Sequence, residues 1–204
     1  MGDLILLRHG QTEWSATGQH TGRTDIPLTP RGVADAAALA PMLAGHPFAA
    51  VFTSPATRAV QTAELAGITG SKQDPDLWEW DYGGYEGMTS AQIQVRRPDW
   101  NLWRDGIIPG DAAHPGETAD EVGARADRVI ARASQFLADG DVLLVAHGHV
   151  LRVLTARWLG LPAAYGRLFK LDTGTVSTLG FEREDPVIVT WNVRPDPSWH
   201  PEIS

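Results

Sequence analysis

Two histidine–glycine pairs stand directly after apolar runs in this sequence. Residues 4–7 are all Leu or Ile and precede Arg8-His9-Gly10, and residues 142–146 are apolar and precede His147-Gly148. Short continuous apolar runs are typical of strands buried on both faces. Open α/β sheets bind ligands at the carboxyl ends of such strands, and glycine allows the backbone to turn there. The sequence therefore predicts two histidines at one edge of a sheet.

A third segment offers a binding site for an anion. Residues 49–53 predict a strand, and Ser54-Pro55 predicts the start of a helix that runs to about residue 66. Arg58 and Thr62 are four residues apart, so they share one face of that helix. A helix start supplies free backbone N–H groups and the positive end of the helix dipole, and Arg58 adds a guanidinium group. From spacing alone, a solvated helix residue is also a fair interpretation of Arg58.

Acidic side chains lie in and after an aromatic, glycine-rich stretch at residues 77–87. The stretch has no helical periodicity, which predicts a loop or short strand that lines a pocket. Glu79 stands between two tryptophans there, and its carboxyl group can act as a general acid and base. Glu86 and Glu117 are nearby alternatives, for which a structural role as a cap or loop anchor competes with catalysis.

These segments together resemble the histidine phosphatase (phosphoglycerate-mutase-like) superfamily. The motifs follow the family's order: Arg8-His9-Gly10, Ser54-Pro55 with Arg58 and Thr62, Glu79 before Tyr82-Gly83-Gly84-Tyr85-Glu86-Gly87, and His147-Gly148. The resemblance spans about residues 4–192. It implies an α/β fold with a mostly parallel central sheet and helices on both faces. It also implies an enzyme that hydrolyses phosphoric monoesters.

The resemblance and the chemistry of phosphoryl transfer suggest roles for five residues. A reaction without a metal needs a nucleophile, cationic groups for the phosphate oxygens and an acid for the leaving oxygen. We expect His9 to be the nucleophile that forms a phosphohistidine, and Arg8 and Arg58 to clamp the phosphate. We expect His147 to be a second phosphate ligand and Glu79 to be the general acid and base.

Competing interpretations of the histidines are weaker. A lone histidine at a strand end more often bonds to the backbone, but the second His-Gly pair argues against that interpretation. His9, Glu79, His147 and His149 could together bind a metal ion. The two arginines beside them would repel a dication, and no cluster of aspartates would offset that repulsion. We therefore expect neither a metal nor a cofactor.

Further details favour a hydrolase over a mutase. The family's mutases carry an insertion with extra cationic ligands, whereas residues 88–117 are short and contain only Arg96, Arg97 and Arg104 as basic residues. Strings such as Gln19-His20-Thr21-Gly22 and residues 79–87 are similar to the yeast-type sedoheptulose-1,7-bisphosphatase branch and to bacterial acid phosphatases of the superfamily. Cofactor-dependent phosphoglycerate mutase activity remains an alternative.

The same resemblance implies a small phosphorylated metabolite as substrate, such as sedoheptulose 1,7-bisphosphate or fructose 1,6-bisphosphate. A bisphosphate needs a second cationic anchor, which Arg152 could provide. The residues expected to contact substrate are Ser15, Thr21, Gly22, Trp80, Asp81, Tyr82, Gly148 and Arg152. A broad-specificity acid phosphatase and a non-catalytic protein that only binds a phosphorylated ligand are further alternatives. The presence of His9, Glu79 and His147 argues against the latter.

The intervening segments must bring these residues together. Residues 15–27 predict a loop over the site, and Thr29-Pro30 predicts the start of a helix that runs toward residue 45 with a break at Pro41. Thr89 with Gln92 and Thr118 with Glu121 have the form of capping boxes, so each predicts a helix start. The other expected elements are an irregular lid at 99–115, a helix at 149–159 and strands at 175–181 and 187–192.

Composition limits the organisation and the partners. The chain has 204 residues, which suits one domain at 1–193 followed by a Pro-rich tail at 194–204. The net charge of -8 argues against nucleic acid or an anionic membrane as partner, although a few arginines in a cleft can still bind a small anion. With no signal-peptide pattern and no run long enough to span a membrane, we expect a cytoplasmic protein. The absence of cysteine excludes a disulfide, a thiolate metal site and a cysteine nucleophile. A homodimer is left open.

Overall fold

A six-stranded sheet forms the centre of the protein. The computed structural model describes residues 1–195, and the strands lie in the order β3-β2-β4-β1-β5-β6. The first four are parallel, whereas β5 is antiparallel to β1 and β6 is antiparallel to β5. This arrangement confirms the mostly parallel α/β fold. The strands are β1 Leu4–Arg8, β2 Ala50–Thr53, β3 Lys72–Gln73, β4 Val142–Ala146, β5 Val176–Glu182 and β6 Asp185–Val193.

The two most buried strands, β1 and β4, are neighbours in register. Leu4 pairs with Val142 and Arg8 pairs with Ala146, so both strands end at the same level. The residues that follow these strands, His9 and His147, therefore lie at the same edge of the sheet. The apolar runs that predict these strands are buried from both sides, as expected for central parallel strands.

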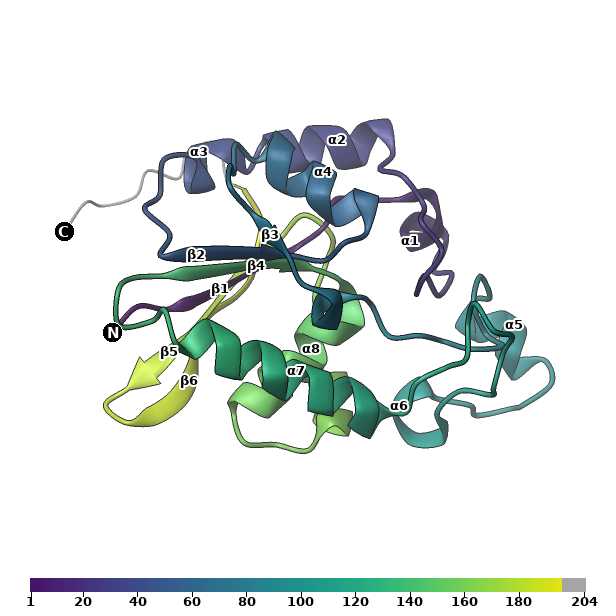
Figure 1. Ribbon diagram of the computed structural model, residues 1–204. Helices are drawn as coiled ribbons and strands as arrows, with labels where there is room; N and C mark the ends of the chain where they lie inside the picture. The colour runs from purple at the N-terminus through teal and green to yellow at the C-terminus, as the bar shows by residue number, and fades with distance from the viewer. Residues whose placement is uncertain (196–204) are drawn as a thin grey trace.

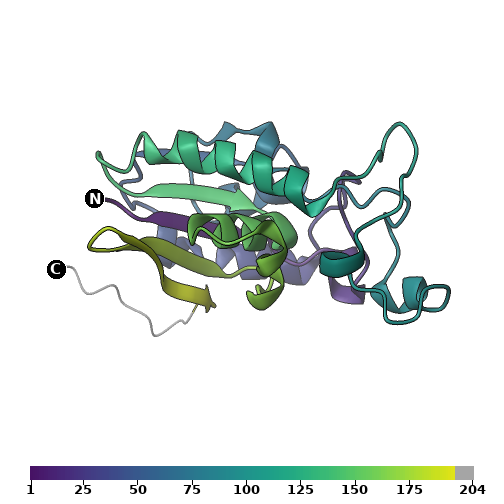
Figure 2. The same ribbon diagram turned by 90° about the horizontal axis from the view of Figure 1, so that it is seen from below.

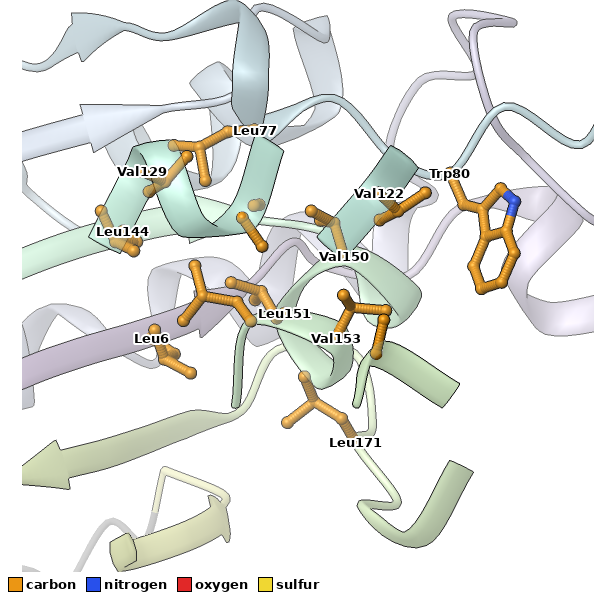
Figure 3. Packing of buried hydrophobic residues seen from close by; sticks show 14 of the residues in the cluster. Leu6, Leu77, Trp80, Val122, Val129, Leu144, Val150, Leu151, Val153 and Leu171 are labelled. Carbon is orange, nitrogen blue, oxygen red and sulfur yellow. The ribbon is translucent and has the colours of Figure 1, made fainter. Parts of the chain in front are cut away.

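Helices cover both faces of the sheet (Figure 1). On one face, α2 Pro30–Ala37, α3 Ala40–Leu43 and α4 Thr57–Leu65 pack over Leu7, Leu143 and Val145. On the other face, α7 Ala119–Ser134 and α8 Gly148–Trp158 pack over Leu6 and Leu144 (Figure 3). The alternation of side chains along β1 and β4 thus divides the core into two layers.

Short elements extend the molecule beyond the carboxyl ends of β1 and β4, as Figures 1 and 2 show. They are α1 Glu13–Thr17, α5 Ser90–Gln94 and α6 Leu102–Asp105. Two 3-10 turns, η1 Pro75–Leu77 and η2 Ala163–Leu168, flank α7 and α8. This extension supplies most of the wall of the cavity described below.

Helix starts were predicted with mixed success. The capping boxes at Thr89 and Thr118 are present, and the break expected at Pro41 separates α2 from α3. The loop predicted for residues 15–27 is wrong at its start, because α1 occupies residues 13–17. Its capping box pairs Thr12 with Ser15, so no Glu or Gln marked it in the sequence.

Two further sequence predictions need correction. The helix expected from Pro55 begins at Thr57, and its first residues have no side-chain cap. Ser54, expected to cap it, accepts from the backbone N–H of Ala56 at 3.3 Å, before the helix begins, and places its hydroxyl 2.7 Å from Nε2 of His147. Residues 99–115 are not wholly irregular, since they contain α6 with Asn101 as its cap.

Within residues 1–195, no helix is long and apolar enough to cross a membrane. Strand β6 ends at Val193, where the predicted domain also ends. Most of the predicted Pro-rich tail, residues 196–204, lies outside the described residues. The domain boundary therefore remains a prediction.

Candidate active site

His9 and His147 meet at the edge of the sheet where β1 and β4 end. Their ring centroids lie 5.0 Å apart with the rings inclined by 62°. Both side chains are buried, with His9 5% exposed and His147 fully covered. The shared register of the two strands causes this meeting, because each histidine is the next residue along its strand.

His9 has one ring nitrogen bonded and one available. Its Nδ1 lies 2.7 Å from the carbonyl oxygen of Gly10 and, as the protonated nitrogen, donates to it. Burial, followed by the nearby Arg58 and Arg8 guanidinium groups, lowers the pKa of His9 well below 6.5. The imidazole is therefore neutral at neutral pH, and Nε2 keeps a lone pair for nucleophilic attack.

The turn after His9 is fixed by α4 and α2. The N–H of Gly10 donates to the hydroxyl of Thr62 at 3.0 Å. A Cβ atom at position 10 would lie 2.4 Å from the carbonyl oxygen of Gly32, so only glycine fits there. Thr62, predicted from its spacing to Arg58, thus acts by holding the backbone beside His9.

Arg8 points toward the first turn of α8. A Cβ atom at Gly148 would lie 3.0 Å from its Cζ, so the absence of a side chain at position 148 makes room for the guanidinium. One terminal nitrogen donates to the carbonyl of Leu171. Nε is buried and has no partner among the described residues. Arg8 also lines the main cavity, where its remaining donors can reach an anion.

Arg58 lies behind the two histidines and is fully buried. It donates from Nε to Nδ1 of His147 at 3.2 Å, and its terminal nitrogens donate to the carbonyls of Gly22 and Thr24 at 3.1 and 3.0 Å. Most of its donors are therefore used within the protein, and Arg58 does not line the cavity. It anchors the segment after α1 and orients His147.

The bond from Arg58 sets the tautomer of His147. Because Nδ1 accepts, Nε2 carries the proton and donates to the Ser54 hydroxyl at 2.7 Å. Burial, with Arg58 and His9 nearby, lowers the pKa of His147 well below 6.5. His147 is thus a neutral hydrogen-bond donor in this arrangement.

The Glu79 carboxylate is held by the N-terminus of α8. One oxygen accepts from the backbone N–H of Trp80 at 2.9 Å and of Val150 at 2.8 Å, and the other accepts from His149 N–H at 2.9 Å. These three bonds fix the orientation of the carboxyl group. Glu79 lines the same cavity as Arg8 and His9, so it can exchange a proton with a group bound there.

The two alternative carboxylates serve as loop anchors. Glu86 accepts from the N–H groups of Gly22 and Thr24 at 2.9 and 3.2 Å. Glu117 accepts from Arg125 at 2.8 Å and from the N–H of Asp81 at 2.9 Å. Neither lines the main cavity.

A cavity of about 450 Å³ opens in front of His9. Of the predicted substrate contacts, Ser15, Thr21 and Tyr82 line it, whereas the other five do not. Among those five, Trp80 is fully buried with its indole N–H on the carbonyl of Glu117, and Arg152 donates to the carbonyl of Gly166. The full lining is Arg8, His9, Ser15, Gly18, Gln19, His20, Thr21, Glu79, Tyr82, Ser90, Gln94, Trp100, Asn101, Leu102, Trp103 and His149.

Sequence reasoning missed much of this lining. His20 was noted only within a longer string, His149 only as a possible metal ligand, and Trp100 and Trp103 lie in the segment predicted as a lid. His149 had a local signal in the sequence His147-Gly148-His149, but nothing local connected α5 and α6 to the edge of the sheet. Among residues 1–195, no three His, Asp or Glu side chains are grouped so as to hold a metal ion.

The fold and this set of side chains define a histidine phosphatase. Residues 4–194 match the family model described as histidine phosphatase superfamily (branch 1), and the chain belongs to that superfamily. The comparisons with individual proteins agree with this class. The two relatives described below, with 42% and 38% identity, are phosphatases, which supports a phosphoric monoester hydrolase, and phosphoglycerate mutases match at 29–31% identity.

An acid phosphatase of Mycobacterium tuberculosis is 42% identical over 184 residues, which cover 88% of this chain and 86% of that protein. Sedoheptulose 1,7-bisphosphatase of Saccharomyces cerevisiae is 38% identical over 189 residues, covering 77% of this chain and 67% of that protein. A solved structure of the product of a Mycobacterium tuberculosis open reading frame superposes with a TM-score of 0.88 at 37% identity, covering 96% of this chain and 99% of that one.

Proposed function

We propose that this protein is a metal-independent phosphohydrolase that acts on small phosphorylated metabolites through a phosphohistidine at His9. The observation that carries the proposal is the state of His9. Its imidazole is buried and its Nδ1 is bonded to Gly10, so Nε2 is left as the nucleophile beside a cavity shared with Arg8 and Glu79. A guanidinium group and a carboxyl group are the further parts that such a reaction needs.

The reaction proceeds in two balanced steps. Nε2 of His9 attacks phosphorus, the bond from phosphorus to the ester oxygen breaks, and Glu79 in its acid form protonates the departing alcohol. Water then attacks the phosphohistidine while the Glu79 carboxylate accepts its proton, which releases phosphate and restores the imidazole. Arg8 stabilises the negative charge on the phosphate oxygens in both steps, and His147 and Arg58 keep the surrounding groups in place.

For the substrate we propose sugar phosphates and sugar bisphosphates, such as sedoheptulose 1,7-bisphosphate or fructose 1,6-bisphosphate. The similarity to a sedoheptulose 1,7-bisphosphatase and the polar lining of the cavity support this class. Arg152, expected to anchor a second phosphate, lies with its guanidinium 4.7 Å from the ring centroid of Trp103 and bonded to backbone carbonyls. A second phosphate would have to share Arg152 with those carbonyls.

A broad-specificity acid phosphatase is the second candidate. The relative with 42% identity carries that name. Lowered histidine pKa values also support it, because His9 keeps its nucleophilic form in acid solution. Phosphoglycerate mutase activity has less support: Arg97 donates to the Tyr85 hydroxyl and Arg104 pairs with Asp105, and neither lines the cavity.

The test is phosphate release from a panel of sugar phosphates, sugar bisphosphates and 3-phosphoglycerate in the presence of a chelator. We expect wild-type hydrolysis that the chelator does not reduce, and at least a roughly 10³-fold loss of kcat in His9→Ala with the fold retained. His46→Ala is the matched control, because His46 pairs with Asp141 away from the cavity. Undiminished activity of His9→Ala would remove the basis of the proposal.

A further inference from the structure

Three ring side chains form an uncharged wall of the cavity. They are His20, Tyr82 and His149, here called the imidazole–phenol cluster, and all three line the cavity that contains His9. The His20 and Tyr82 ring centroids lie 4.7 Å apart, and Tyr82 and His149 lie 5.8 Å apart. The cluster brings together residues from the loop after α1, the loop after Glu79 and the first turn of α8.

The hydroxyl of Tyr82 fixes the tautomer of His149. It lies 2.6 Å from Nδ1 of His149. Burial raises the pKa of Tyr82 well above 10, so the phenol keeps its proton and donates it to Nδ1. Burial, with Arg152 nearby, lowers the pKa of His149 well below 6.5. His149 is therefore neutral, and its Nε2 carries the ring proton.

That Nε2–H group is unused inside the protein. It makes no hydrogen bond to the part of the chain that the structure describes, and it is not among the polar atoms sealed from solvent. Because His149 lines the cavity, this donor is available to a bound molecule. Tyr82 thus holds a hydrogen-bond donor in a fixed orientation in front of the reaction site.

His20 lines the cavity beside Tyr82 with a second imidazole ring. Its side chain is 8% exposed, and its Nε2 is covered without a partner among the described residues. Because that nitrogen is sealed from solvent, His20 contributes to the cavity wall through the other atoms of its ring. Burial lowers the pKa of His20 to about 4, so this ring is neutral as well.

Two indole rings complete this part of the cavity. Trp100 lies 5.7 Å from His20 and Trp103 lies 5.3 Å from His149, measured between ring centroids. The charged groups nearby are Arg8 and Glu79 at the reaction site and Arg152 behind Trp103. Aromatic faces with neutral donors suit a carbon chain that bears hydroxyl groups, because such a chain offers C–H faces and hydroxyl oxygens.

We propose that the imidazole–phenol cluster is the specificity subsite for the hydroxylated, uncharged part of the substrate, with the Nε2–H group of His149 donating to one of its hydroxyl oxygens. This inference rests on the proposed phosphatase function, and it specifies the chemical class of the leaving group as a hydroxylated carbon chain. Esters whose leaving group carries hydroxyls next to the scissile oxygen gain a hydrogen bond that aryl esters cannot form. Tyr82 acts as the positioning residue, since its hydroxyl bonds to Nδ1 of His149 and thereby orients the Nε2–H group that contacts the substrate.

The test compares two kinds of substrate in matched variants. Fructose 6-phosphate, ribose 5-phosphate and glycerol 3-phosphate have hydroxylated leaving groups, whereas 4-nitrophenyl phosphate has none. In His149→Phe we expect kcat/KM for the hydroxylated esters to fall about tenfold further than for the aryl ester, mainly through KM. Tyr82→Phe should lower the ratio of kcat/KM for the hydroxylated esters to kcat/KM for the aryl ester by a smaller factor. His149→Gln, which restores an N–H donor, should recover part of the preference for hydroxylated esters.

His46→Phe is the control, and it should leave the ratio of the two kcat/KM values unchanged. Equal losses for both kinds of substrate, or no loss in either, would overturn the subsite. Wild-type protein that hydrolyses only the aryl ester would also overturn it while leaving the proposed function intact. Wild-type protein that hydrolyses no phosphate ester would overturn the proposed function itself.

A second measurement does not depend on the folding of any variant. Imidazole ¹⁵N spectra of wild-type protein report which nitrogen of each histidine is protonated. We expect His149 to be the neutral Nε2–H tautomer at pH 7, and addition of a hydroxylated phosphate ester to His9→Ala protein to shift its Nε2 signal. An Nδ1–H tautomer, or an Nε2 signal that does not respond to the ester, would overturn the inference.

Discussion

At the residue scale, the site depends on which nitrogen of each histidine is already bonded. His9 donates from Nδ1 to the backbone, whereas His147 and His149 accept at Nδ1 from Arg58 and Tyr82. The result is one imidazole with a free lone pair, one whose N–H group is bonded to Ser54 and one, His149, whose N–H group is free at the cavity. This division separates the nucleophile from the hydrogen-bond donors without any change of charge.

Glu79 should matter in proportion to how much the leaving group needs a proton. Glu79→Gln keeps the size and most backbone hydrogen bonds but removes the acid. We expect a loss of roughly 10²- to 10⁴-fold in kcat for alkyl phosphates and a much smaller loss for 4-nitrophenyl phosphate. Steady-state kinetics with both substrates provide the check, and equal losses would show that Glu79 is not the acid.

Gly148 should be needed for the position of Arg8. In Gly148→Ala the new methyl group would lie 3.0 Å from the Arg8 Cζ and would push the guanidinium away from its place. We expect kcat/KM to fall roughly 10- to 100-fold, since small displacements of a phosphate-binding group have effects of that size. Urea unfolding serves as the control for stability. Wild-type kinetics in a fully folded Gly148→Ala protein would rule out this function of Gly148.

At this scale the sequence indicated the reactive residues better than the specificity residues. Arg8, His9 and His147 could be predicted because Arg8 ends one apolar strand of the sheet and the two histidines directly follow two of its strands. The arrangement of Arg58 could not, since its three main partners come from two loops far from α4 in sequence. His20 and Trp100 reach the cavity only through tertiary packing, which no local pattern records.

At the element scale, helix α7 holds the loop that carries Glu79. Arg125 on α7 is buried and donates to Glu117 and to the carbonyls of Asp76 and Trp78. Glu117 in turn accepts from the backbone of Asp81. The loop from η1 to Tyr82 is therefore bonded to α7 on both sides of Glu79, and α7 packs on the face of the sheet that carries Leu6 and Leu144.

Arg125→Met should therefore weaken both stability and catalysis. It leaves the largely buried Glu117 with the more distant Arg23, at 4.0 Å, as its remaining cation, so we expect the free energy of unfolding to fall by about 3 kcal/mol. Arg128→Met is the matched control on the same helix, because Arg128 pairs with Asp76 at the surface and should contribute about 1 kcal/mol or less. Urea unfolding of the two variants provides the comparison. Similar effects would contradict the structural importance of the buried pair.

Elements with a strong local signal were predictable and short ones were not. The central strands have unbroken apolar runs, and α7 has both a capping box and an apolar face. Strand β3 has only two residues and exists because it pairs with β2. Helices α1 and α6 have five and four residues, too few for any periodicity to appear. These short elements build the cavity wall, so its shape was the least predictable part.

At the scale of the whole molecule, the buried neutral histidines should make stability depend on pH. His9, His20, His147 and His149 all have pKa values below 6.5 in the folded protein. Below pH 6.5 the unfolded chain binds protons that the folded chain does not, so stability is full above that pH and falls as the pH drops. Each such histidine contributes up to about 1.4 kcal/mol per pH unit.

His20 gives the clearest window, because its pKa of about 4 bounds the range. The stability that the protein loses through His20 is lost between pH 6.5 and 4 and amounts to about 3 kcal/mol. We expect His20→Gln to unfold with a shallower dependence on pH than wild-type protein over that range, as measured by urea unfolding at several pH values. An unchanged dependence would show that His20 is protonated equally in both states.

The net charge of the molecule and the charge of its site have opposite signs. The chain carries a net charge of -8, yet Arg8 lies beside His9 in the lining of the cavity and Arg58 lies behind the histidines. Local charge decides the binding of a small anion, whereas the overall charge disfavours nucleic acid. The family assignment, which covers residues 4–194, agrees with a small phosphorylated substrate.

The central claim is that the phosphoryl group passes through Nε2 of His9, and trapping that intermediate tests it most directly. Wild-type protein would be mixed with 4-nitrophenyl phosphate, quenched in alkali within one turnover and digested for mass spectrometry, because phosphohistidine survives alkali but not acid. We predict a phosphoryl group on the peptide that contains His9, located on the imidazole, and none in His9→Ala. A burst of nitrophenol with no phosphorylated His9, or a phosphoryl group on another residue, would contradict the account.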